Sequence, residues 1–273
     1  WSSDVCSSDL CDSDALGGGP EPAFAGFADG GGGGEYMPAD TSRCNVAIGL
    51  KAGYAISMGK SNVAIGALAM ASPCLNNGYG NVALGPQALY RNEGGSFNIS
   101  LGAGANGKNQ NGDHNIALGK NSVGQCSGCG VQTGSFNVGI GGYALARNFS
   151  GHNNLAIGYQ SLYRNTCGYG NIALGRQTLH DNTNGQKNVA IGWCSNFCNT
   201  TGNGNVSIGM GSMAFNCTGV YNVSVGAGAL SNLTCGKENI ALGKGSLGDN
   251  QVGGYNVALG SCAGINSVTG NHN

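Results

Sequence analysis

The 273-residue sequence has few charged residues, no long apolar run and no recognisable targeting segment. Charged residues make up only 9% of it, and the formal net charge of -1 provides no field that would attract nucleic acid or an anionic membrane. No stretch approaches the roughly 18 apolar residues of a membrane helix, and the N-terminus lacks the basic and apolar segments of a signal peptide. We therefore expect no nucleic-acid partner and no membrane insertion of this segment.

Groupings of catalytic or ligand-binding residues are also missing. Gly102 to Lys108 (GAGANGK) matches most of a phosphate-binding loop, but Asn109 stands where Ser or Thr should bind the metal. Cys126 and Cys129 have no second close pair to complete a zinc site. No nucleophile or carboxylate pair accompanies the four histidines, which are His114, His152, His180 and His272. We expect a protein without catalytic residues, cofactor or metal, and therefore not an enzyme.

Glycine is abundant, with 53 residues, and it belongs to a repeat. An asparagine recurs every 17 residues, with longer gaps of 19 and 22 where insertions occur. Its positions are Asn45, Asn62, Asn81, Asn98, Asn115, Asn137, Asn154, Asn171, Asn188, Asn205, Asn222, Asn239 and Asn256, and the chain ends on another, Asn273. A fixed period of this length indicates a stack of small units that cannot fold singly.

Counting each unit from its asparagine as position 1, positions 2 and 4 are aliphatic in every unit, as in Ile172 and Leu174. This alternation predicts a short strand that buries these two side chains inside the coil. Position 5 is always glycine, which indicates a sharp bend. A small residue at position 8 and a frequent Leu or Met at position 9 predict a second short strand or extended segment.

The repeat predicts an all-β fold, a parallel β-solenoid of about thirteen 17-residue coils. Successive coils of such a fold place each residue over its counterpart at a spacing of ~4.8 Å, so valine stacks on valine and asparagine on asparagine. We expect the position-1 asparagines to form a structural ladder of side chains along the stack.

Position 3, between the two aliphatic residues, is never larger than serine. A strand face open to water should instead carry large polar residues, so we predict that this face packs against another subunit in a trimer. The alternative is a coil so flattened that position 3 meets its own second strand. The residues are Ala47, Ala64, Ala83, Ser100, Ala117, Gly139, Ala156, Ala173, Ala190, Ser207, Ser224, Ala241 and Ala258.

Two domains are expected, a flexible Gly/Ala/Asp-rich leader over residues 1–43 and a repeat domain over residues 44–273 that is truncated at its C-terminus. Residues 1–10 resemble translated adapter read-through, a sequencing artefact. Twelve cysteines favour an oxidising compartment. Cys198, Cys217 and Cys235 occupy positions 11, 13 and 14 of consecutive coils, where one disulfide between neighbours could form, although free packed thiols are the alternative.

Position 10 carries a ring in several units and could form an exposed stripe that binds glycans or proteins. Gly107, Gly124 and Ala146 interrupt it, so buried-edge packing is the alternative. The rings are those of Tyr54, Tyr90, Tyr163, His180 and Phe197.

The NVAIG segments (45 to 49, 62 to 66 and 188 to 192), NIALG (171 to 175) and the ALYRN and SLYRN segments resemble head repeats of YadA-like trimeric autotransporter adhesins. They are equally similar to GNxAIGxxAL arrays of phage tail-fibre-type proteins. The resemblance implies a left-handed homotrimeric β-roll. It also implies an extracellular location, at a cell or virion surface, and binding to a host-surface glycan or protein.

We therefore predict a non-enzymatic attachment protein, a segment of a cell-surface adhesin or fibre. The alternative is the shaft of a bacteriophage tail fibre. An alternative of another class is an ice-binding solenoid, which needs a regular threonine face. Position 14 supplies Thr133, Thr201, Thr218 and Thr269, but Cys167, Asn184 and Val252 interrupt the row.

Overall fold

The computed structural model describes residues 45–54, 56, 58–72, 76–124 and 132–273. They belong to two compact units, one ending at Thr133 and the other beginning at Gly134. The leader predicted at residues 1–43, its boundary residue Cys44, and the pair Cys126 and Cys129 lie outside the described residues.

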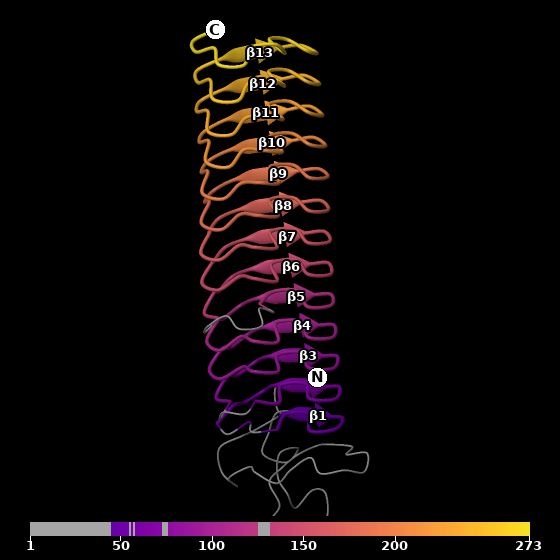
Figure 1. Cartoon of the computed structure of the whole chain (residues 1–273). Helices are drawn as coiled ribbons and strands as arrows, with labels where there is room; N and C mark the ends of the chain where they lie inside the picture. Colours follow the sequence, from indigo (N-terminus) through magenta and orange to yellow (C-terminus); the bar gives the residue numbers. More distant parts are fainter. Residues whose placement is uncertain (1–44, 55, 57, 73–75, 125–131) are drawn as a thin grey trace, which may run out of the picture. The chain divides into compact units, whose positions relative to one another are not determined.

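Each unit is a series of coils with one three-residue strand per coil. The first unit contains β1 (Val46–Ile48), β2 (Val63–Ile65), β3 (Val82–Leu84), β4 (Ile99–Leu101) and β5 (Ile116–Leu118). The second contains β6 (Val138–Ile140), β7 (Leu155–Ile157), β8 (Ile172–Leu174), β9 (Val189–Ile191), β10 (Val206–Ile208), β11 (Val223–Val225), β12 (Ile240–Leu242) and β13 (Val257–Leu259). Within each unit Figure 1 shows the strands stacked in chain order.

Neighbouring strands pair in parallel and in register, so Ile172 of β8 lies beside Val189 of β9, and Ala173 lies beside Ala190. The same register holds from β1 to β5 and from β6 to β13. The prediction of an all-β parallel β-solenoid with 17-residue coils is thereby confirmed, with thirteen strands among the described residues.

The two faces of the strands are the reverse of those predicted. Ala173 is 0% exposed, whereas Ile172 beside it is 38% exposed. The same pattern holds throughout, because the middle residue is buried in β2 to β13 and half-buried, as Ala47, in β1. The position-3 residues therefore line the interior of their own coil, and the prediction that they pack against another subunit is wrong.

The flattened shape of the coil explains why position 3 must be small. The hydroxyl of Ser161, at position 8, donates to the carbonyl of Ala173 in the next coil over 2.9 Å, and Ser195 does the same to Ser207. At such a close approach only a methyl or hydroxymethyl group fits between the two walls. Larger apolar side chains fill the interior from position 9, where Leu162 and Leu179 are fully buried.

The wall opposite each strand consists of successive turns, so the predicted second strand is wrong. Gln177 and Leu179, at positions 7 and 9, have φ angles of 55° and 51°, which extended strands do not adopt. Gly175 at position 5 has φ 136°, and an added Cβ would lie 2.7 Å from the carbonyl oxygen of Gly192 in the next coil. Glycine is therefore required where the strand ends and the turns begin.

Within each unit the position-1 asparagines form a series of hydrogen bonds from coil to coil. Oδ1 of Asn154 accepts from the backbone N–H of Asn171 at 3.0 Å and from its Nδ2 at 3.1 Å. Nδ2 of Asn171 also donates to the carbonyl of Gly185 at 2.8 Å, which closes the coil. All donors and acceptors of the buried amide are thus used, and each asparagine joins two coils.

A second asparagine row runs at position 12 through the coils of β6 to β10. Nδ2 of Asn165 donates to Oδ1 of Asn148 at 2.7 Å and to the carbonyl of Gly168 at 2.8 Å. The repeat of asparagine near this position is visible in the sequence, but its part in a ladder was not predicted. The two rows bracket the turn between positions 12 and 1.

Candidate functional site

The strands carry a continuous aliphatic surface, which we call the strand face, formed by positions 2 and 4. Ile157, Ile172 and Ile208 expose between 36% and 38% of their surface, and none of the thirteen described strands carries a charged or polar residue at these positions. The eight strands β6 to β13, with two outward residues each, contribute sixteen aliphatic side chains. Because the register is exact from strand to strand, these side chains lie in parallel rows.

The opposite side of the second unit carries polar and aromatic residues on the turns between positions 5 and 12. We name one group of these residues the turn surface. It consists of Tyr143, Arg147, Tyr159, Gln160, Tyr163, Arg176, Gln177 and His180. These side chains come from positions 6, 7, 10 and 11, while positions 8 and 9 of the same turns are buried.

Three of the predicted position-10 rings stack on one another. The rings of Tyr163 and His180 are 5.1 Å apart at 18°, and those of His180 and Phe197 are 4.8 Å apart at 4°. Tyr54 and Tyr90 lie in the first unit, outside this stack. His180 therefore has a ring on each face, and this part of the stripe presents ring edges to solvent.

Two arginines of the turn surface lie over tyrosine rings. The guanidinium carbon of Arg147 is 5.3 Å from the ring centre of Tyr163, and that of Arg176 is 6.0 Å from the ring centre of Tyr159. Tyr159 also meets Tyr143 edge to face at 6.1 Å. Such contacts hold the guanidinium plane in place and leave its N–H edges available.

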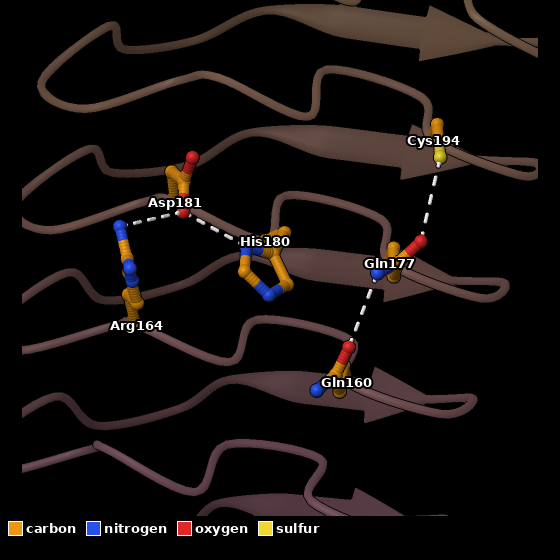
Figure 2. Close-up of polar contacts among 6 residues, drawn as sticks. All are labelled: Gln160, Arg164, Gln177, His180, Asp181 and Cys194. Carbon is orange, nitrogen blue, oxygen red and sulfur yellow. Dashed lines mark hydrogen bonds and ion pairs between the residues drawn. The ribbon is translucent and has the colours of Figure 1, made fainter.

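The amide side chains of Gln160 and Gln177 follow one another from coil to coil, as Figure 2 shows. Nε2 of Gln177 donates to Oε1 of Gln160 at 3.1 Å, and the thiol of Cys194 donates to Oε1 of Gln177 at 3.9 Å. In a second group in the same view, Asp181 accepts from Arg164 at 3.2 Å and contacts Nδ1 of His180 at 2.8 Å. Arg164 is thus neutralised by a carboxylate of the next coil.

Cys198, Cys217 and Cys235, the candidates for one disulfide between neighbouring coils, are free thiols in the structure. Burial raises the pKa of the Cys198 thiol, and the nearby Cys217 and Asp181 charges raise it further. Burial also raises the pKa of Cys194, against a smaller opposing effect of Arg176. A raised pKa leaves less thiolate at neutral pH, so neither is an activated nucleophile.

A further row of rings, at the corner just before the position-1 asparagine, was not predicted. Phe97 and Tyr221 lie over glycines of the preceding coil, where a Cβ on Gly80 or Gly204 would approach the ring to 2.8 or 2.7 Å. In the same corner His152 stacks on Tyr169 at 4.9 Å. The signal in the sequence is the alternation of Gly and an aromatic residue at this position in neighbouring units.

Threonine hydroxyls are used inside the stack. Thr166 and Thr183, at position 13, donate to the carbonyls of Thr183 and Thr200 in the following coils, each at 2.9 Å. Thr201 and Thr218, at position 14, are exposed. The hydroxyls committed to backbone carbonyls are thus those of position 13, a different row from the exposed position-14 threonines considered for an ice surface.

In the described parts of residues 45–273, no three His, Cys, Asp or Glu side chains gather where they could hold a metal ion. Gly102 and Lys108 of the loop-like sequence GAGANGK belong to an ordinary turn that follows β4. Among the described residues, no helix reaches the length and apolarity needed to cross a membrane. A scan against protein-family models and searches of curated proteins and solved structures found no match to this chain.

Proposed function

We propose that this chain is a non-enzymatic attachment protein, a solenoid segment of a cell-surface adhesin or of a tail fibre, located outside the cell or on a virion. The observation that carries the proposal is the strand face. Exposed apolar patches of such extent on soluble proteins mark surfaces for association. A stack of coils with the same strand and one face that associates with other copies is suited to building a stiff fibre.

A second copy of the chain is the partner that fits the strand face best. The aliphatic rows repeat at the coil spacing of ~4.8 Å, and another solenoid of the same repeat matches this spacing along its whole length. Sixteen outward aliphatic residues in β6 to β13, together with their flanking residues, approach the roughly 20 residues per side of a standard interface. Three copies around an axis would cover the face, in keeping with the left-handed homotrimeric β-roll of the resembling adhesins.

Assembly through the strand face leaves the turns exposed, on the far side of each coil. The side chains that differ most between coils lie there, as in Tyr159, Arg176 and Trp193 at position 6, where other units have Ala67, Ala103 or Ala227. We propose that attachment uses the turns, while the strands provide assembly.

Sedimentation velocity tests the assembly. We expect the intact chain, of 27.2 kDa, to sediment as an oligomer, and the double variant Ile172→Glu with Ile208→Glu to sediment as a single chain. The matched control, Thr201→Glu with Thr218→Glu, adds the same charge at exposed turn positions and should keep the oligomer. A wild-type chain that stays monomeric, or an unchanged mass for the strand-face variant, would contradict the proposal.

A further inference from the structure

We propose that the turn surface of the second unit is a binding site for an anionic oligosaccharide, a sugar chain carrying carboxylate or sulfate groups. This proposal rests on the attachment function above and names its ligand class. The site is centred on the turn Tyr159 to Tyr163, with Arg147 contributed by the preceding coil and Arg176 by the following one.

The repeat itself shows that the fold does not require these side chains. At position 10 the coils around Tyr163 and His180 carry Ala146, Ala214 and Gly248. All of these coils have the same strand and the same turns, so the ring side chains are additions to a scaffold that forms without them. Residues concentrated in neighbouring coils without a structural need are candidates for recognition.

The two arginines have the arrangement of anion receptors. In the part of the chain that the structure describes, neither Arg147 nor Arg176 has a carboxylate within ion-pair distance, whereas Arg164 pairs with Asp181 at 3.2 Å. Each guanidinium rests on a tyrosine ring, which fixes its plane and reduces the entropy lost on binding. Their N–H edges are suited to bidentate bonds with a carboxylate or sulfate.

Amide groups beside the arginines supply donors and acceptors for sugar hydroxyls. Gln160 uses Oε1 to accept from Gln177, and among the described residues its Nε2 has no partner. Trp193, two coils beyond Tyr159 at the same position, is 54% exposed and offers an apolar ring to the C–H groups of a sugar. Since coils repeat at ~4.8 Å, these groups extend over several sugar units along the stack.

The charge distribution favours an anion. Residues 45–273 contain 11 Lys and Arg against 5 Asp and Glu, a net charge of +6, whereas residues 1–44 contain 1 against 8, a net charge of -7. The overall charge of -1 conceals this difference. Successive bases of a nucleic acid would need a series of open ring faces. Both faces of His180 are covered, and Tyr163 lies between Arg147 and His180, so this stack adds no open face to that of Trp193. The exposed edges and guanidinium groups therefore favour an anionic sugar.

Isothermal titration of the full chain with four probes tests the proposal. The probes are a tetragalacturonate, a sulfated tetrasaccharide, a neutral tetrasaccharide of glucose, and a short single-stranded DNA. We expect binding of one or both anionic sugars, weakened by salt, with an affinity at least about tenfold lower in Arg147→Gln with Arg176→Gln. Which of the two sugars binds distinguishes a carboxylate from a sulfate.

The control variant Arg91→Gln with Lys244→Gln removes the same charge at the same repeat positions, 11 and 6, where the facing residues are Gly107 and Ala227 and not rings. It should bind as the wild type does. The proposal is overturned if neither anionic sugar binds, if the control loses as much affinity, if the neutral sugar binds equally well, or if DNA binds more tightly through the same arginines. Sedimentation is a separate readout, so an oligomer that binds no sugar would refute this site and leave the assembly standing.

Discussion

At the scale of single residues, burial controls the chemistry of the cysteine thiols. Burial is the main cause that raises the pKa of both Cys194 and Cys198. A thiol with a raised pKa holds its proton to higher pH, so its thiolate fraction below the ordinary pKa of about 8.5 is smaller than that of a free cysteine.

We therefore expect iodoacetamide to alkylate Cys194 and Cys198 more slowly than N-acetylcysteine at neutral pH. The part of the difference that comes from ionisation should shrink as the pH rises past the raised pKa, because both thiols are then ionised. Site-resolved mass spectrometry over a pH series measures both rates. Alkylation of Cys194 faster than the free thiol at neutral pH would show that Arg176, and not burial, dominates.

At the scale of the elements, the asparagine ladder is the main polar link between coils. Asn171 provides the acceptor for both the N–H and Nδ2 of Asn188 and donates to the carbonyl of Gly185, all of them buried. Removing its amide leaves the buried N–H of Asn188 without a partner, and such a buried orphan costs about 1–3 kcal/mol. It also removes one of the two bonds of Asn188 Nδ2, which keeps Gly202, and one of the two bonds of the Gly185 carbonyl, which keeps Asn182.

Asn171→Ala should accordingly lower the free energy of unfolding by about 2–4 kcal/mol in a urea titration followed by circular dichroism. Asn184→Ala, at an exposed turn position of the same coil, is the control and should change it by less than about 0.5 kcal/mol. Equal effects of the two substitutions would mean that the ladder contributes little beyond ordinary surface bonds.

The elements also show which parts of the coil can be predicted from sequence. The strand Ile172–Leu174 could be predicted from the alternation of aliphatic and small residues, because β-branched residues favour extended backbone. The bend at Gly175 could be predicted from the glycine that every unit has there, because glycine adopts positive φ without strain. The turns opposite the strand could not be predicted in this way, since Gln177 and Leu179 have positive φ values, which residues other than glycine seldom adopt. Contacts with neighbouring coils impose that backbone, and propensity does not reveal it.

At the scale of the whole molecule, the sequence left open which face of each strand points into the coil. Alternation divides residues 172 to 174 into two faces but does not say which one is interior, and the assumption that aliphatic residues are buried gave the wrong answer. The limit on size at Ala173 was the better signal. It indicated close packing, which an oligomer interface and a narrow coil interior explain equally well. The position-10 stripe was partly predictable, but the arginines lying over its rings depend on contacts between coils.

The direction in which the strand faces point also connects the fold to the proposed function. An interior filled by alanine methyls and position-9 leucines leaves the larger aliphatic residues of the strands outside, where they can join copies of the chain. The turns of the second unit are then the surface that carries recognition. Both proposals depend on which face of the strand points inward.

The most direct test of this claim compares Ala173→Glu with Ile172→Glu, two neighbouring residues given the same charge. We expect Ala173→Glu to destabilise the protein by at least about 3 kcal/mol, because it places a carboxylate in a narrow interior, and Ile172→Glu to leave the fold intact. Urea unfolding followed by β circular dichroism measures both. A folded Ala173→Glu protein beside an unfolded Ile172→Glu protein would contradict the account.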